Sequence, residues 1–278
     1  MAFITVDPRT HAPVPPNFVV AQRPQDYSAQ DHATWRTLFR RQSELLHGRA
    51  VEEFHDGLAA LGITADGIPD FDAMNHVLMR ATGWRVIAVP GLVPDEVFFA
   101  HLAARRFPAG YWIRKPEQLD YIEEPDVFHD VFGHVPLLMQ PRYAEYMAAY
   151  GRAGLTLPAD ALKPLARLYW YTVEFGLMQT ADGLRIFGAG IMSSAGEAIY
   201  ALDSATPARM RFDCERVLRS DYKIDDFQRI YFVLAGYDDL PALDRDALAT
   251  HIAAVHGKPV LAPGELIASD VSVALTAH

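Results

Sequence analysis

The chain of 278 residues is 50% hydrophobic, enough for one large domain or two small ones with a substantial core. Its 15 Phe, 12 Tyr and 4 Trp exclude disorder over most of its length, because disordered chains are poor in aromatic residues. The formal net charge of -10 argues against nucleic acid or an anionic membrane surface as a partner. One cysteine, Cys214, excludes an internal disulfide and any zinc or iron–sulfur site built on several cysteines.

The ends of the chain show no targeting or membrane-spanning pattern. The N-terminus lacks a basic region followed by an apolar run, and no stretch approaches ~18 consecutive apolar residues. We therefore expect a soluble, cytoplasmic protein. Residues 1–27 are rich in proline and have little periodicity, which predicts an extended arm on the surface or a disordered segment.

Helical spacing of apolar residues begins after Ser28, which forms a capping-box pattern with Asp31, and continues to Gly62 as one helix or two broken near Gly48. The same spacing predicts helices over residues 71–82, 94–106, 195–202, 211–219 and 241–256. A longer helical pattern follows Pro158, is interrupted near Pro164 and runs through LARLYWYTVEFGLMQT. The β-like runs are Trp84–Val89, Tyr111–Arg114 and Leu184–Phe187, and Ile230–Leu234 fits either a strand or a buried helical segment.

No linker divides the chain after residue 27. These patterns predict a mostly α fold with a few short β-strands, in a single domain over residues 28–257. The tail over residues 258–278 has no clear period and no coiled-coil pattern.

Two histidine pairs share a five-residue separation, His129 with His134 and His251 with His256. On a regular α-helix, residues five apart point about 140° away from each other, so both can bind one ion only where the helix ends or bulges. Gly133 and the proline two residues after His134 supply such an interruption for the first pair. The second pair lies at the end of an ordinary amphipathic helix, where it would complement the helix dipole.

The first pair and Asp130 lie in the apolar run PDVFHDVFGHVPLL, where an unpaired buried polar group costs about 1–3 kcal/mol. These side chains therefore bind a metal or form a hydrogen-bonded pair in the core. Glu174, in the apolar segment LYWYTVEFGLM, needs a partner for the same reason. That partner is a cation or an arginine such as Arg167 or Arg185.

Two imidazoles and one carboxylate form the facial triad of non-haem ferrous oxygenases, which leaves positions open for oxygen and substrate. The same ligands with one open position suit a zinc hydrolase, although the zinc-protease pattern HExxH is absent. A helical binding protein with structural histidines is the non-enzyme alternative. The residues alone leave these three interpretations open.

Three segments in order, PDVFHDVFGHVPLL, LYWYTVEFGL and IFGAGIMSSAGE, resemble the signatures of the pterin-dependent aromatic amino acid hydroxylases. The likeness is greatest to the short bacterial phenylalanine 4-hydroxylases and extends from about Tyr27 to about Asp239. It implies a helical basket fold and a ferrous ion held by His129, His134 and Glu174.

The resemblance also implies a substrate pocket. Arg114, in YWIRKPE, matches an arginine that binds the substrate carboxylate, and Ser193 matches a serine that supports the site through hydrogen bonds. The other matching positions are Pro125, Trp170 and Phe175 in the aromatic pocket, Gly190 at a close approach to substrate, and Tyr121 as a further candidate.

The pterin contacts implied by the resemblance come from other segments. Phe98, in VPDEVFFAHLA, matches a phenylalanine that stacks on the pterin, although Phe99 makes the register uncertain. The remaining matches are Gly91, Leu92 and Val93 in a pterin-binding loop, Tyr169 near the iron, and Glu197 as an acid around the iron ligands. Two positions depart from the animal members: Asp130 replaces a glutamate that helps to hold the pterin, and Ile122 replaces a threonine that contacts substrate.

The implied activity is hydroxylation of L-phenylalanine to L-tyrosine with O2, Fe(II) and a tetrahydropterin, either tetrahydrobiopterin or a bacterial relative. Tryptophan or tyrosine hydroxylation is the alternative within the family. The longer animal members add a regulatory domain and a tetramer-forming coiled coil, neither of which this sequence shows, so we expect a catalytic core that is a monomer.

Overall fold

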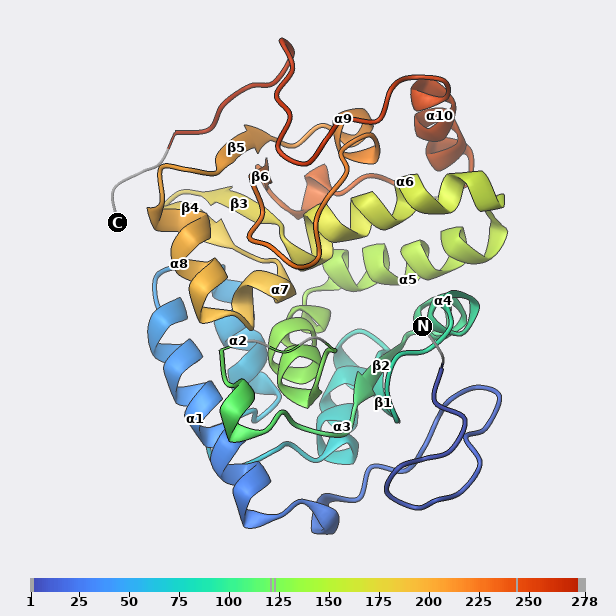
Figure 1. The fold of residues 1–278 in the computed structure, drawn as a ribbon, viewed down its shortest axis with the longest axis vertical. Helices are drawn as coiled ribbons and strands as arrows, with labels where there is room; N and C mark the ends of the chain where they lie inside the picture. The colour runs from blue at the N-terminus through green and yellow to red at the C-terminus, as the bar shows by residue number, and fades with distance from the viewer. Residues whose placement is uncertain (1–2, 121, 123, 244, 275–278) are drawn as a thin grey trace.

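The computed structural model describes residues 3–120, 122, 124–243 and 245–274, whose helices enclose one hydrophobic core (Figure 1). The α-helices are α1 (Ala29–Leu46), α2 (Glu52–Ala60), α3 (Phe71–Ala81), α4 (Asp95–Ala103), α5 (Pro141–Thr156), α6 (Ala159–Tyr169), α7 (Ala189–Met192), α8 (Ala195–Asp203), α9 (Cys214–Leu218) and α10 (Arg245–Val255). The strands are β1 (Arg85–Val89), β2 (Arg106–Gly110), β3 (Leu177–Thr180), β4 (Gly183–Ile186), β5 (Ala208–Arg211) and β6 (Ile230–Leu234). This confirms the predicted mostly α, single-domain fold with short strands.

Shorter helical turns connect these elements, and two of them are π-helices. The 3-10 turns are η1 (Pro24–Asp26), η2 (Pro116–Gln118), η4 (Pro136–Met139) and η6 (Tyr237–Asp239), and the π-helices are η3 (Phe128–His134) and η5 (Trp170–Glu174). No helix within the described ranges is long and apolar enough to cross a membrane.

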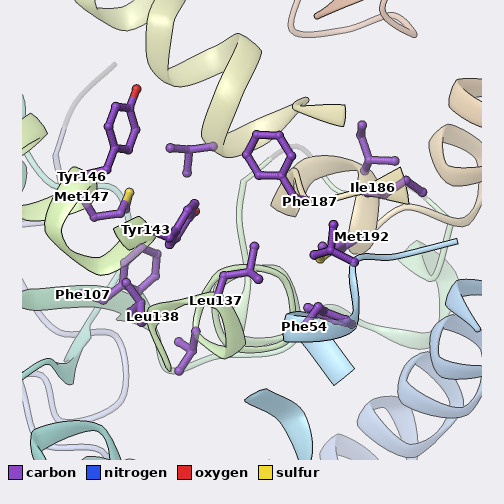
Figure 2. Packing of buried hydrophobic residues seen from close by; sticks show 14 of the residues in the cluster. Phe54, Phe107, Leu137, Leu138, Tyr143, Tyr146, Met147, Ile186, Phe187 and Met192 are labelled. Carbon is purple, nitrogen blue, oxygen red and sulfur yellow. The ribbon is translucent and has the colours of Figure 1, made fainter. Parts of the chain in front are cut away.

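Helix α1 begins at the predicted capping box: the Ser28 hydroxyl accepts from the Asp31 N–H, and the Asp31 carboxylate accepts from the Ser28 N–H. The chain then turns at Gly48, whose φ of +70° lies in the left-handed region that glycine adopts at little cost, before α2 begins. The interpretation as two helices is therefore confirmed. Figure 2 shows Phe54 of α2 in the core with Leu137 of η4 and Met192 of α7.

Strands β1 and β2 pair in parallel, and α4 forms the crossover between them. The strand predicted over Tyr111–Arg114 is wrong, because the pairing ends at Gly110 and the chain leaves the sheet there. The helix predicted over residues 94–106 ends earlier, at Ala103, since Arg105 takes a φ of +54° and Arg106 already pairs in β2.

The second sheet has the strand order β4-β3-β6-β5, and β6 is buried along its whole length. Residues 177–180, predicted as the end of a long helix, form β3 instead. A short apolar run has no period that separates a buried strand from a helix, and only pairing with β4 and β6 decides it. The other end of that pattern also differs, because α6 continues through Pro164 without interruption.

Two further predictions need correction. The helix predicted over residues 211–219 is only α9, because Arg211 belongs to β5, which pairs with β6. Helix α5 was not predicted, although it packs on α4 and carries eight buried residues. The helices predicted over residues 71–82, 195–202 and 241–256 correspond to α3, α8 and α10.

Both ends of the described chain pack on the body. In the arm, Val20 forms a bridge with Ala88 of β1, and the buried Asp7 carboxylate accepts from the Tyr111 hydroxyl at 2.7 Å. In the tail, Ser272 forms an antiparallel bridge with Met210 and so covers the β5 edge of the sheet.

Candidate active site

Three side chains converge where η3 meets η5. The Nε2 atoms of His129 and His134 lie 3.2 Å apart, and Glu174 places one carboxylate oxygen 3.3 Å from His134 Nε2 and the other 3.7 Å from His129 Nε2. The arginines weighed as partners of Glu174 bind elsewhere, because Arg167 pairs with Asp221 and Arg185 donates to the carbonyl of Asp182. The carboxylate of Glu174 therefore faces the two histidines.

The five-residue spacing works because η3 is a π-helix. Its wider turn, with hydrogen bonds from residue i to i+5, brings residues five apart to neighbouring positions on one face. Gly133 allows η3 to approach α7, since a Cβ at this position would lie 2.9 Å from the Ala189 carbonyl oxygen. The interruption that the sequence required between the two histidines is thus a π turn rather than a helix end.

Asp130 also lies near the two histidines, and its carboxylate lies within 4.8 Å of their ring nitrogens. One of its oxygens accepts from the Gly110 N–H at 2.7 Å, and burial raises its pKa to about 7. The Glu174 oxygens stand in closer contact with both Nε2 atoms. Glu174 is therefore the better third ligand, with Asp130 beside it.

The protonation of the three groups is coupled through their contacts. Burial lowers the pKa of His129 to about 4, so its imidazole is neutral, as a metal ligand requires. Burial acts against charge on His134 and on Glu174 as well. Their mutual attraction and hydrogen bond outweigh it, raising the pKa of His134 and lowering that of Glu174. Each of these two side chains therefore favours the charged form of the other, and a bound cation would take the place of the proton on His134.

The geometry fits a single metal ion. Divalent first-row metals bind imidazole nitrogen and carboxylate oxygen at about 2.0–2.2 Å, so donors at right angles around one ion lie about 3 Å apart. The three observed separations come close to that value. His129 has the outer contact typical of a ligand histidine, because its Nδ1 lies 2.8 Å from the Ser193 hydroxyl.

Two cavities meet at these residues, and both are lined by Pro125, His129 and Glu174. The larger has a volume of about 520 Å³. Of the residues predicted for the substrate pocket, the structure brings together in it Arg114, Pro125, Trp170, Phe175, Gly190 and Ser193. Tyr121 lies outside the described residues. Ile122 also lines this cavity.

The smaller cavity has a volume of about 250 Å³. It brings together every residue predicted to contact the pterin: Gly91, Leu92, Val93, Phe98, Asp130 and Tyr169. The structure resolves the register of α4, since Phe98 faces this cavity while Phe99 is buried against Tyr150 and Gly154 of α5.

Arg114 is held by a partner that the sequence analysis missed. Asp126 is fully buried and accepts from Arg114 Nε at 2.8 Å, from Arg114 Nη2 at 2.9 Å and from the His129 backbone N–H at 3.0 Å. The carboxylate thus links the arginine of one cavity to a histidine shared by both. Its position within the apolar run PDVFHDVFGHVPLL, three residues before His129, was the available signal.

Glu197 lines the larger cavity, but its carboxylate is bonded away from the three converging groups. One of its oxygens accepts from the Gln228 N–H at 3.1 Å and from the Tyr231 hydroxyl. Gln228 also accepts from the Trp170 indole N–H at 2.9 Å. Neither Gln228 nor Tyr231 stood out in the sequence.

Comparison with known proteins agrees with this geometry. Residues 20–250 match the family described as "Biopterin-dependent aromatic amino acid hydroxylase". A relative named phenylalanine-4-hydroxylase, from Ralstonia nicotianae, is 55% identical over 256 residues, which cover 92% of this chain and 82% of the relative.

Two crystal structures of phenylalanine hydroxylase from Chromobacterium violaceum are also similar to this chain. One contains iron(III) and oxidised 7,8-dihydrobiopterin, with a TM-score of 0.88 and 52% identity over 92% of this chain and 93% of the other. The second contains iron and phenylalanine, with a TM-score of 0.86 and 50% identity over 93% and 94%. The chain therefore belongs to the biopterin-dependent aromatic amino acid hydroxylases.

Proposed function

We propose that this protein is a phenylalanine 4-monooxygenase, which uses Fe(II), a tetrahydropterin and O2 to convert L-phenylalanine to L-tyrosine. The observation that carries this proposal is the cluster of His129, His134 and Glu174 at the junction of two cavities. One cavity would hold the amino acid and the other the pterin, with the iron between them. Relatives named for phenylalanine favour it over tyrosine or tryptophan. Membership of a biopterin-dependent family leaves nothing to favour a zinc hydrolase.

His129, His134 and Glu174 would bind the iron from one side, which leaves the opposite side open towards both cavities. The iron and the pterin, when bound, supply the reduction of O2 that amino acid side chains cannot perform. The protein's part is to orient the reactants and to exclude water. With Nε2 bound to the metal, His129 would carry its proton on Nδ1 and donate it to the Ser193 hydroxyl, which lies 2.8 Å away.

On the substrate side, Arg114 would bind the amino acid carboxylate. Asp126 occupies Nε and one N–H of Nη2, and the Leu119 carbonyl oxygen accepts from Nη1 at 3.4 Å, so one N–H of Nη1 and one of Nη2 remain for a ligand. Trp170, Phe175 and Pro125 provide an apolar wall for the phenyl ring. Gly190 is required beside them, because a Cβ there would lie 2.9 Å from the Phe175 ring.

On the pterin side, Phe98 would stack on the flat ring while backbone groups of residues 91–93 bind its polar edge. Asp130 points a buried carboxyl group into the same cavity, and Tyr169 packs edge-on against Phe98 with ring centroids 5.9 Å apart. Glu197 would act at longer range, by fixing the wall behind the site.

We further propose that residues 28–257 form the catalytic domain, and that the protein acts as a cytoplasmic monomer. The single core and the packing of arm and tail on it support this organisation. Sedimentation at micromolar concentration tests the monomer, which a stable dimer would refute.

The direct test is product identification with iron-loaded protein, a tetrahydropterin, O2 and each aromatic amino acid in turn. We expect L-tyrosine from L-phenylalanine as the main product. His134→Ala should lose both bound iron and turnover, whereas His251→Ala, in the second histidine pair at the end of α10, should retain both. Full iron binding and turnover by His134→Ala would refute the ligand assignment.

A further inference from the structure

Gln228 lies behind the wall of the larger cavity, and its side chain is hydrogen-bonded to two chain segments of that wall. Its side chain is 4% exposed, and the residue does not itself line the cavity. Its Oε1 accepts from the Trp170 indole N–H at 2.9 Å. Its Nε2 donates to the carbonyl oxygens of Lys223 and Asp226, at 3.0 and 3.1 Å.

The two segments joined in this way both contribute residues to the lining of the cavity. Trp170 belongs to η5, the same π-helix that carries Glu174, while residues 224–227 line the cavity from the segment before β6. The indole is stacked on Tyr222 at 4.2 Å between ring centroids, and Phe175 packs against it at 4.6 Å. Stacking limits the tilt of the ring, but the hydrogen bond to Gln228 fixes its rotation in the stacking plane.

The chemistry of these partners specifies an amide. An indole N–H can only donate and the two carbonyl oxygens can only accept, so the group between them must accept on one side and donate on the other. A carboxylate would satisfy the indole but not the carbonyls, and a thioether would satisfy neither. Because the Gln228 backbone N–H binds Glu197 independently, a change of side chain leaves that contact in place.

We propose that Gln228 is a positioning residue for the amino acid substrate, which acts by holding the Trp170 indole and residues 223–226 in a fixed relation. This inference rests on the proposed function, because it concerns where the substrate ring lies relative to the iron. When the two walls move independently, the ring is bound less tightly and is placed less accurately. When the substrate is misplaced, O2 takes the two electrons and two protons of the tetrahydropterin and leaves as hydrogen peroxide, so the pterin is oxidised without hydroxylation of the ring.

The test uses Gln228→Met, which has a similar shape but none of the three side-chain hydrogen bonds. We expect the KM for L-phenylalanine and its calorimetric Kd for the iron-loaded protein to rise about tenfold. Tyrosine formed per pterin oxidised should fall, while iron content and the KM for pterin stay unchanged. Gln228→Glu, which keeps the acceptor for the indole, should give a smaller rise. Gln179→Met is the matched control, since within the described residues the Gln179 side chain donates only to the neighbouring Thr180 carbonyl, and Gln179 lines neither cavity.

The outcomes separate this inference from the function on which it rests. If the wild type does not form tyrosine, the proposed function fails. If the wild type forms tyrosine, and folded Gln228→Met has a KM, a Kd and a yield of tyrosine per pterin oxidised within twofold of the wild-type values, the role of Gln228 is refuted. A purely structural role would lower thermal stability and kcat without a selective rise in the KM for phenylalanine, and it too would refute the proposal. If Gln228→Met does not fold, the same criteria apply to Gln228→Glu.

Discussion

The Asp126 carboxylate joins Arg114 to the backbone of His129, and its loss should lower both stability and substrate binding. Each of its oxygens accepts two hydrogen bonds: Oδ2 from the N–H and Nε of Arg114, and Oδ1 from Arg114 Nη2 and the His129 N–H. In Asp126→Asn, one oxygen becomes an NH2 group, which cannot accept. Two of the four donors then lose their acceptor, and the buried guanidinium, only 4% exposed, loses its counter-charge.

Removing one partner of a buried ion pair costs about 3–5 kcal/mol. A domain of this size loses about 2–4 °C of Tm per kcal/mol, so we expect Tm to fall by about 10 °C. The KM for L-phenylalanine should rise as well, because the guanidinium is no longer held in place. Thermal unfolding of iron-free and iron-loaded protein, with steady-state kinetics, measures both effects.

The matched control is Asp203→Asn. Asp203 pairs with Arg49 at a similar distance, 2.7 Å, but the two side chains are 39% and 24% exposed. An exposed pair contributes about 0–1 kcal/mol, so this variant should unfold close to the wild-type temperature. A Tm of Asp126→Asn within 2 °C of wild type, with an unchanged KM, would show that the carboxylate holds neither Arg114 nor the site.

Three further predictions concern other parts of the chain. Gly133→Ala places a methyl group 2.9 Å from the Ala189 carbonyl oxygen. The variant should lower the free energy of unfolding, measured by urea titration, by about 1–3 kcal/mol. An unchanged urea midpoint would contradict the close packing of η3 on α7. Burial raises the pKa of Cys214 to about 12, so iodoacetamide at pH 8 should label it rapidly only in urea, and rapid native labelling would argue against its burial. Burial acts to raise the pKa of Asp7, but hydrogen bonds led by the one from Tyr111 outweigh burial and lower the pKa. The ionised carboxylate therefore stabilises the arm at pH values above its ordinary pKa of 3.8. This stabilisation is lost as the pH falls through the lowered pKa. Amide hydrogen exchange in the arm should therefore be faster in Asp7→Asn than in the wild type at pH 7, and faster in the wild type itself only below pH 3.8. Equal protection of the arm in both proteins at pH 7 would rule out this role of Asp7.

The metal-site candidates could be found in the sequence because their surroundings were unusual. Two histidines and an aspartate within an apolar run, and a glutamate in an apolar helix, each required a partner. The structure places His129, His134 and Glu174 together, as the family likeness implied. The helices with clear amphipathic spacing, such as α3 and α8, were predictable on the same physical basis.

The parts that escaped prediction depend on contacts between distant segments. The local sequence of β3 predicts the end of a helix, and only its pairing with β6, more than 50 residues away, identifies it as a strand. The role of Gln228 is likewise absent from its local sequence, since its partner Trp170 lies 58 residues earlier. Helix α5 was missed although eight of its residues are buried.

The two π-helices explain how an ordinary helical scaffold builds this site. In η3, one face carries the ligand histidines, while Phe128 and Phe132 on another face stack at 4.7 Å and pack against Trp35 and Phe54. A regular α-helix could keep this aromatic packing, but its turn would separate the two imidazoles by about 140°. The extra residue in the π turn of η3 lets the core contacts and the ligand geometry be satisfied together, and Glu174 comes from the second π-helix, η5. The π turn of η3 is therefore found where the donor atoms must converge, and the packed aromatic face holds it there.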